Sequence, residues 1–302
     1  MRKFYLVILL HLFLVDAKSQ VAQYFNIFSK EGSFDYTIEQ KILNSTPPNK
    51  LFAQLETYYS DTVVQVRQQA YYLTFKIGSQ AELDEQQRAV RILLNGCADA
   101  NKAVVGRCLS YLKSFSIYTF DSNSREKLNY LLQKKEVPHF RELYMLAGYV
   151  DVGFGTIQQQ LLSVEDYSSN QLWVMRVALA RMGHTESLKY CMQLADQVED
   201  GNNKVAYLVP DLIYTRQKEA LDYCIEILKS DEKNCLSPNP DVDAKILCGY
   251  RVLELLAPVI KHFPYKPGPA GSLQVNDYEK ALLGAREWFT THPNYEIHTD
   301  KF

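Results

Sequence analysis

The six cysteines are the residues of this sequence best suited to covalent chemistry, because paired thiols can form disulfides. Cys235 lies in the stretch D-E-K-N-C-L-S-P-N-P-D at residues 231–241, whose prolines oppose a helix. It is therefore free to reach Cys248 in the helix that is expected to follow. The sequence predicts a Cys235–Cys248 disulfide, and closing a loop of this size would stabilise the fold by about 3 kcal/mol.

The other four cysteines are not expected to pair with one another. Cys191 and Cys224 occupy equivalent positions in two copies of a repeat, so they should point in the same direction. Cys97 and Cys108 lie on either side of an expected helical turn, at heights that match poorly for a disulfide. We interpret Cys191 and Cys224 as small buried apolar groups, and the redox state of all four stays open.

Residues typical of catalysis or metal binding are scattered along the chain. None of the histidines beyond residue 19 lies in H-E-x-x-H or at a helical spacing from another ligand: His139, His184, His262, His292 and His298. The sequence contains no G-x-S-x-G and no Walker motif, and its acidic pairs lie near expected helix ends without convergent partners. We therefore predict a protein that is not an enzyme, with no catalytic residue, no cofactor and no metal.

A repeat of helical segments organises the chain. Residues 186–194, E-S-L-K-Y-C-M-Q-L, return as E-A-L-D-Y-C-I-E-I at residues 219–227, 33 positions later. A second pattern, an Asx residue followed six positions later by arginine, occurs in three pairs: Asp61 with Arg67, Asn101 with Arg107, and Asn170 with Arg176. With Arg141 included, the arginines follow one another at separations of 40, 34 and 35 residues. Periods of about 30 to 45 residues indicate a solenoid of helix pairs.

Residues 61–78, D-T-V-V-Q-V-R-Q-Q-A-Y-Y-L-T-F-K-I-G, resemble the second helix of a HEAT repeat. Asp61 at the helix start, Arg67 after a valine, Ala70 and Leu73 stand where that pattern expects them. The resemblance covers about residues 48–262 and implies an all-α fold, a right-handed α-α superhelix of about six helix pairs. It also implies that the three Asx–Arg pairs form a ladder between neighbouring repeats, which is a structural role.

The first 19 residues resemble an export signal. Arg2 and Lys3 precede an apolar run, and Ala17 and Ser19 are small residues at the positions that a signal peptidase recognises. The run of about a dozen residues is too short to span a bilayer. The formal net charge of −2 gives no basic surface for nucleic acid. We expect an exported protein, periplasmic or extracellular, with no stable membrane insertion after signal removal.

The spacing of apolar residues places the helices and the domains. After a short helix near 36–43, the pairs are expected at 49–60 with 61–78, 82–97 with 101–117, 122–134 with 138–150, 153–164 with 168–183, 185–199 with 202–215, and 216–230 with 242–262. Prolines and glycines keep 264–271 from being helical. Asn276 and Glu279 then resemble a capping box for a final helix over the last repeat. The predicted domains are a signal peptide (1–19), the solenoid (20–263), and a linker, capping helix and tail (264–302).

One helix face is the candidate surface for a partner. Gln65, Gln69, Tyr72 and Lys76 share the side of the 61–78 helix opposite to its apolar stripe. Most of the 21 tyrosines are otherwise expected to pack between helices with the hydroxyl at the rim. The leading interpretation is an exported, non-enzymatic scaffold that binds a protein or peptide on its superhelical surface. Two alternatives stay open: an enzyme whose site is assembled from several helices, and a binder of glycans or cell-wall fragments.

Overall fold

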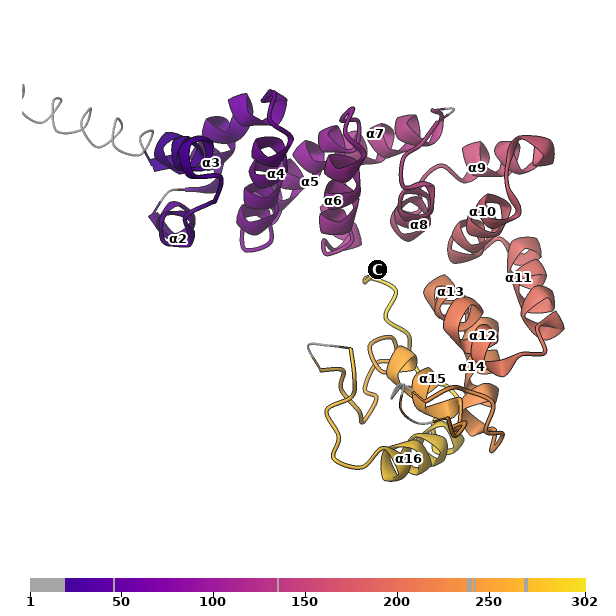
Figure 1. The fold of residues 1–302 in the computed structure, drawn as a ribbon. Helices are drawn as coiled ribbons and strands as arrows, with labels where there is room; N and C mark the ends of the chain where they lie inside the picture. Colours follow the sequence, from indigo (N-terminus) through magenta and orange to yellow (C-terminus); the bar gives the residue numbers. More distant parts are fainter. Residues whose placement is uncertain (1–19, 46, 135, 238–240, 242, 269–270) are drawn as a thin grey trace, which may run out of the picture. The chain divides into compact units, whose positions relative to one another are not determined.

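The computed structural model describes residues 20–45, 47–134, 136–237, 241, 243–268 and 271–302, so the predicted signal peptide at 1–19 lies outside the described residues. The described residues form helices and no β-strand, with only isolated β-bridges between them. The prediction of an all-α fold is thus confirmed. The chain divides into two compact units, residues 1–142 and 143–302 (Figure 1). The right-handed superhelix over the whole chain stays a prediction.

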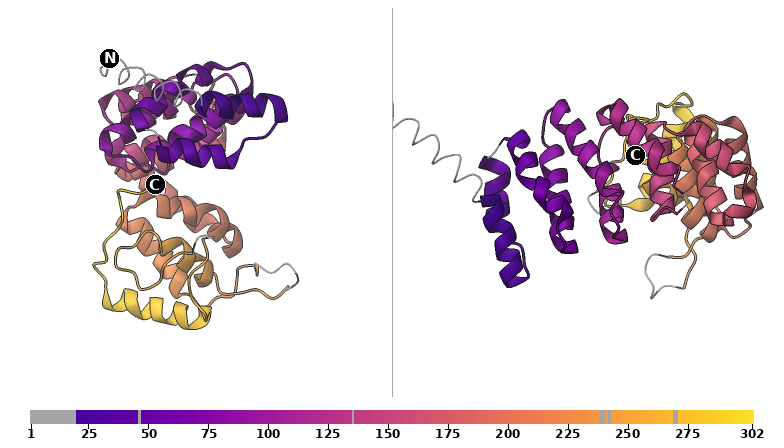
Figure 2. Two further views of the ribbon diagram at one scale, coloured as in Figure 1. Left: turned by 90° about the vertical axis from the view of Figure 1, so that its left-hand side faces the viewer. Right: turned by 90° about the horizontal axis from the view of Figure 1, so that it is seen from above.

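The first unit is a row of helices joined by short turns. After a helix over residues 20–31, which the sequence analysis did not predict, it contains α2 (Tyr36–Ser45), α3 (Pro48–Leu55), the 3-10 turn η1 (Glu56–Ser60), α4 (Val64–Gly78), α5 (Leu83–Gly96), α6 (Lys102–Leu112), η2 (Ile117–Thr119) and α7 (Ser122–Leu132). Helix α4 packs against α3, α5 and α6, and α5 packs against α7. The right-hand view of Figure 2 shows these helices, indigo to magenta, following one another in chain order. Each pair therefore buries its apolar side against the next.

Two glycines allow the helices of the first unit to approach closely. A Cβ atom on Gly78, the last residue of α4, would lie 2.3 Å from the Cβ of Ala89 in α5. A Cβ atom on Gly96, at the end of α5, would lie 2.4 Å from the Sγ of Cys108 in α6. Ala89 and Cys108 are completely buried. Any larger residue at either glycine would push the neighbouring helix away.

The second unit continues the same arrangement. Helix α8 (Phe140–Val150) contains the boundary and is followed by α9 (Phe154–Leu161), η3 (Val164–Asp166), α10 (Ser169–Arg181), α11 (Thr185–Gln197), α12 (Gly201–Asn203), the π-helical turn η4 (Lys204–Leu208), α13 (Val209–Thr215), α14 (Lys218–Lys229), α15 (Gly249–Leu256) and α16 (Tyr278–Thr291). Helix α10 packs on α11 and α13, and α14 packs on α13 and α15. Helix α16 covers α14 and α15, as expected of a capping helix.

The core of the second unit combines close packing with a buried hydrogen bond. A Cβ atom on Gly148 of α8 would lie 2.6 Å from the hydroxyl oxygen of Tyr214 and 2.9 Å from the main-chain oxygen of Ala178. Glycine is therefore required where α8 meets α10 and α13. Trp173 of α10 donates its indole N–H to the carboxylate of Asp211 in α13 at 2.6 Å. Asp211 is only 2% exposed, so this bond provides a partner for a buried acceptor.

Three predicted features near the C-terminal end differ in the structure. The helix expected at 242–262 is α15, which covers only 249–256, because the disulfide loop extends to Cys248. The helix expected at 202–215 is interrupted by the π-helical turn. The N-cap of α16 is Asp277, whose carboxylate accepts the amide of Lys280 at 3.0 Å, in place of Asn276.

Candidate functional site

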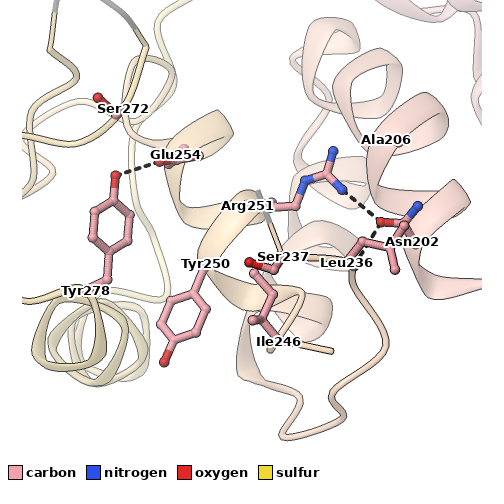
Figure 3. Close-up of a pocket in the computed structure, with 10 residues that line it drawn as sticks. All are labelled: Asn202, Ala206, Leu236, Ser237, Ile246, Tyr250, Arg251, Glu254, Ser272 and Tyr278. Atoms are coloured by element: carbon pink, nitrogen blue, oxygen red, sulfur yellow. Dashed lines mark hydrogen bonds between the residues drawn. The ribbon is translucent and has the colours of Figure 1, made fainter. Parts of the chain in front are cut away.

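A cavity of about 690 Å³ opens in the second unit, and it is the candidate functional site (Figure 3). Its wall is built from α12 and η4, from the loop closed by the disulfide, from α15, and from the start of α16. Side chains from sequence positions 202 to 278 therefore meet in one place. The volume lies within the range of about 300–1,000 Å³ that is typical of ligand pockets.

The disulfide holds one side of this cavity. Cys235 and Cys248 are bonded, with their Cα atoms 5.0 Å apart, and they are the pair that the sequence indicated. Cys235 also exchanges two main-chain hydrogen bonds with Ile246, of 3.2 and 2.8 Å. The loop is therefore clamped at its base, and the clamp holds Leu236 and Ile246 in the cavity wall.

The π-helical turn shapes the opposite side. Pro210 has no amide proton, so it cannot donate the α-helical bond to the carbonyl of Ala206. The chain widens before the proline, and the amide of Val209 donates to the carbonyl of Lys204, five residues earlier. This widened turn brings Ala206 into the cavity wall. Single π-helical turns occur often at functional sites, which fits the position of this one.

The polar groups of the wall bond mainly to one another. The side-chain oxygen of Asn202 accepts hydrogen bonds from Nη1 of Arg251 at 3.0 Å and from the main-chain amide of Leu236 at 3.1 Å. The hydroxyl of Tyr278 donates to Glu254 at 2.6 Å. Burial, together with this bond to Glu254, raises the pKa of Tyr278. These groups are therefore fixed in place, and they stiffen the wall.

Apart from Ser237 and Ser272, the rest of the cavity surface is apolar or aromatic. The rings of Tyr250 and Tyr278 meet edge to face with their centroids 6.4 Å apart. Leu236, which is 55% exposed, and Ile246 complete this surface from the disulfide loop. Such a lining accepts a ligand by shape and by apolar contact. General acid-base chemistry would instead need a titratable group directed at the ligand.

The first predicted Asx–Arg pair is bonded differently from the expectation. Arg67 donates Nε and Nη2 to the carboxylate of Asp99 at 2.8 and 2.9 Å. Its Nη1 donates to the main-chain carbonyl of Asp61 at 2.7 Å. The carboxylate of Asp61 accepts the amide of Val63 at 2.7 Å, before α4 begins. The ion pair between neighbouring repeats therefore joins Arg67 to Asp99, which the repeat pattern did not single out.

The second predicted pair does not form an ion pair, since one partner is an uncharged asparagine. Asn101 caps α6 by accepting the amide of Ala103 at 2.9 Å, and Arg107 is exposed on that helix. A different ion pair links these repeats: Arg91 of α5 bonds to Asp121, the N-cap of α7. The 30-residue separation of Arg91 and Asp121 is the only sequence signal that could have suggested it.

In the third predicted pair, Asn170 and Arg176 have separate roles. Asn170 is exposed in the first turn of α10, whose N-cap is Ser168. Ser168 and Gln171 form a capping box, so α10 has no need of Asn170. Arg176 instead lies over the ring of Tyr190, with its guanidinium carbon 4.2 Å from the ring centroid. This is a cation–π contact rather than a step of an Asx–Arg ladder.

The predicted partner face on α4 is mostly covered. It comprises Gln65, Gln69, Tyr72 and Lys76, of which Gln65 is exposed and the others are partly buried. Gln69 donates to the hydroxyl of Tyr24 at 2.5 Å and to Glu39 at 3.2 Å. Tyr24 donates to Glu39 at 2.9 Å, and both belong to the helices that precede α3. Part of this face is therefore a contact within the first unit. The helix over residues 20–31, which the sequence patterns did not indicate, covers Gln69.

Comparison with known proteins adds no relative, since the chain matches no protein-family model and no curated protein. Within the part of the chain that the structure describes, no three or more His, Cys, Asp or Glu side chains gather in a way that could hold a metal ion. Among the same residues, no helix has both the length and the apolar character needed to cross a bilayer.

Proposed function

We propose that the protein is an exported, non-enzymatic scaffold of HEAT-like helix pairs that binds a protein or peptide partner. The cavity of the second unit would receive an apolar or aromatic side chain of that partner. Binding energy would come mainly from burying this side chain against Leu236, Ile246 and Tyr250.

The observation that carries the proposal is that polar groups of the cavity wall bond to one another, while apolar surface beside them is exposed. Arg251 is bonded to Asn202, and Glu254 is bonded to Tyr278. The surface of Leu236, 55% exposed at the rim, lies beside them. A wall of this kind favours an apolar side chain over a sugar, because a sugar presents many hydroxyl groups that need partners.

The test is selection of peptides from a displayed random library on the folded protein, followed by titration calorimetry of the selected sequences. We expect the peptides to share an aromatic or large aliphatic residue. The Leu236→Asp variant should weaken their binding by about tenfold or more, because it places a charge at the apolar rim. Leu236 is largely solvent-exposed, so the variant should still fold.

Leu283→Asp is the matched control. Leu283 lies on α16 and is 57% exposed, close to the 55% of Leu236, but it does not line the cavity. Its substitution should leave peptide binding unchanged. Peptides that bind equally well to Leu236→Asp would contradict the proposal. Oligosaccharides that bind with the same dependence on Leu236 would move the function to glycan binding.

We also propose export to an oxidising compartment. The support is the signal-like sequence at residues 1–19 together with the Cys235–Cys248 disulfide, since disulfides persist mainly outside the cytosol. Mass spectrometry of protein from the external fraction of its native host should give an N-terminus at Gln20. Recovery of protein that begins at Met1 from that fraction would contradict export through a cleaved signal.

A further inference from the structure

Residues 298–302 lie against a group of side chains of the second unit, named the groove below, that do not line the cavity. The groove is formed by Tyr149 of α8, Arg181 at the end of α10, Tyr214 of α13 and Arg216, which follows α13. Three helices of the second unit therefore converge on one non-helical segment, residues 298–302.

The groove bonds to every main-chain carbonyl of this segment. Arg216 donates Nε to the carbonyl of residue 298 at 3.1 Å and Nη2 to the main-chain oxygen of residue 302 at 3.2 Å. Arg181 donates Nη2 to the carbonyls of residues 299 and 301 at 2.9 and 3.2 Å. Tyr149 donates its hydroxyl to the carbonyl of residue 300 at 2.7 Å. Since main-chain carbonyls are common to all peptides, the four bonds to residues 298–301 do not depend on the sequence of the segment.

One side chain of the segment is recognised by aromatic contact. The ring of Phe302 meets those of Tyr149 and Tyr214, with centroid distances of 5.6 and 5.4 Å. Lys301, in contrast, is exposed. The groove therefore contacts a curved backbone, whose first and fifth residues both bond to Arg216, and one aromatic residue.

The charges of the groove explain its preference for oxygen acceptors. Burial, followed by the nearby charge of Arg181, lowers the pKa of Arg216 to about 10. Burial also lowers the pKa of Arg181. Both guanidiniums bond to main-chain oxygens, Arg181 to those of Tyr214 and residue 299 and Arg216 to those of Ile213 and residue 298. Two partly buried cations side by side need such acceptors whenever the groove closes over a ligand.

Arg216 also has an unusual backbone. Its φ angle is 56°, in the left-handed region that non-glycine residues rarely adopt. This conformation ends α13 and lets the Arg216 side chain bond both to the carbonyl of Ile213 at 2.6 Å and to the tail. A residue that ended the helix with less strain, such as glycine, would lack the guanidinium that makes these bonds.

We propose that this groove is a binding site for a curved, non-helical peptide segment of a partner protein that carries an aromatic residue. Residues 298–302 occupy the groove as an internal competitor, and a partner segment displaces them. The proposal concerns a different surface from the cavity and does not depend on the function assigned to it.

The test uses the full chain and a fluorescent peptide with the sequence of residues 295–302, Y-E-I-H-T-D-K-F, followed by fluorescence anisotropy. In Phe302→Ala the chain's own tail loses its aromatic contact, so the free peptide should bind about tenfold or more tightly than it binds the unsubstituted protein. Lys301→Ala is the matched control, because only the main chain of Lys301 contacts the groove, and it should behave as the unsubstituted protein does. A peptide whose phenylalanine is replaced by alanine should bind about tenfold or more weakly.

Two further measurements separate this site from the cavity. Arg216→Lys in the Phe302→Ala background keeps the positive charge but loses the forked donor geometry, so peptide binding should fall by about tenfold or more. Leu236→Asp in the same background should leave it unchanged, so the two proposals can fail separately.

Hydrogen exchange of residues 298–302 completes the test. In Phe302→Ala these amides should exchange faster than in the unsubstituted protein, because the tail is released. A released tail without peptide binding would overturn the proposal. A tail that stays protected would overturn it as well, because residues 298–302 would then be a permanent part of the fold.

Discussion

Arg67 and Asp99, 32 residues apart, form a bidentate ion pair between neighbouring repeats of the first unit, with hydrogen bonds of 2.8 and 2.9 Å. Their side chains are only 14% and 9% exposed. Burial alone would raise the pKa of Asp99, but the bonds from Arg67 and from the amide of Asn101 outweigh it and lower that pKa. The pair is therefore a source of stability that depends on pH.

Asp99→Asn should destabilise the protein by about 1–3 kcal/mol at pH 7, because the partly buried Arg67 would then face an uncharged amide in place of a carboxylate. The folded pKa of Asp99 is below its unfolded value, so the unfolded state binds more protons in acid. The contribution is complete above the unfolded pKa of about 3.9 and is lost as the pH falls through the folded pKa.

The measurement is urea denaturation of both proteins between pH 3 and pH 7. The difference in free energy of unfolding should be largest at neutral pH and should shrink in acid. Lys229→Ala, which breaks the exposed Lys229–Glu226 pair, is the control and should cost no more than about 0.5 kcal/mol. A difference for Asp99→Asn that grows in acid would contradict this account.

Gly148→Ala should destabilise the second unit by about 1–3 kcal/mol, because the new methyl group would overlap Tyr214 and the main chain of Ala178. Gly155→Ala is the matched control, since Gly155 is helical and a Cβ there meets no atom within 4 Å. Alanine has the higher helix propensity, so Gly155→Ala should be neutral or stabilising by up to about 1 kcal/mol. Thermal denaturation of the two variants should therefore shift in opposite directions, and equal shifts would refute the predicted close approach of α8.

Peptide mapping without reduction should recover a peptide pair joined through Cys235 and Cys248. Burial raises the pKa of both Cys191 and Cys224 to about 12, so these thiols should react slowly with iodoacetamide at pH 8 until the protein is unfolded. Reduction of the disulfide should lower the stability of the second unit by about 3 kcal/mol. Free thiols at 235 and 248 in protein from an oxidising compartment would argue against the clamp on the cavity loop.

Gln69→Ala should lower the free energy of unfolding by about 1–3 kcal/mol, because Tyr24 and Glu39 lose a hydrogen-bond partner in a buried cluster. Gln65→Ala, one turn earlier on α4 and exposed, should have no measurable effect. Chemical denaturation distinguishes them. Equal stability of the two variants would show that the helix over residues 20–31 does not cover Gln69 in solution, and would return Gln69 to the open surface.

The sequence alone determined most of the helices. Their apolar residues recur at steps of three and four, which is a local property that each segment carries by itself. Helix α5, predicted at 82–97, is found at 83–96, and α10, predicted at 168–183, is found at 169–181. The Cys235–Cys248 pair could be proposed for a similar reason, because only 13 residues separate the two cysteines.

Tertiary structure decided which side chains meet. The Asx–Arg spacing is a helical pattern and does not say which carboxylate of the next repeat reaches Arg67, since that depends on the distance and rotation between helices. The cavity likewise needs Asn202, Leu236, Tyr250 and Tyr278 from separate elements, and no short motif connects them. The groove is the extreme case. Arg181 and Arg216 recognise main-chain carbonyls, which every residue possesses, so the amino-acid sequence of residues 298–302 carries no signal of that contact beyond the ring of Phe302.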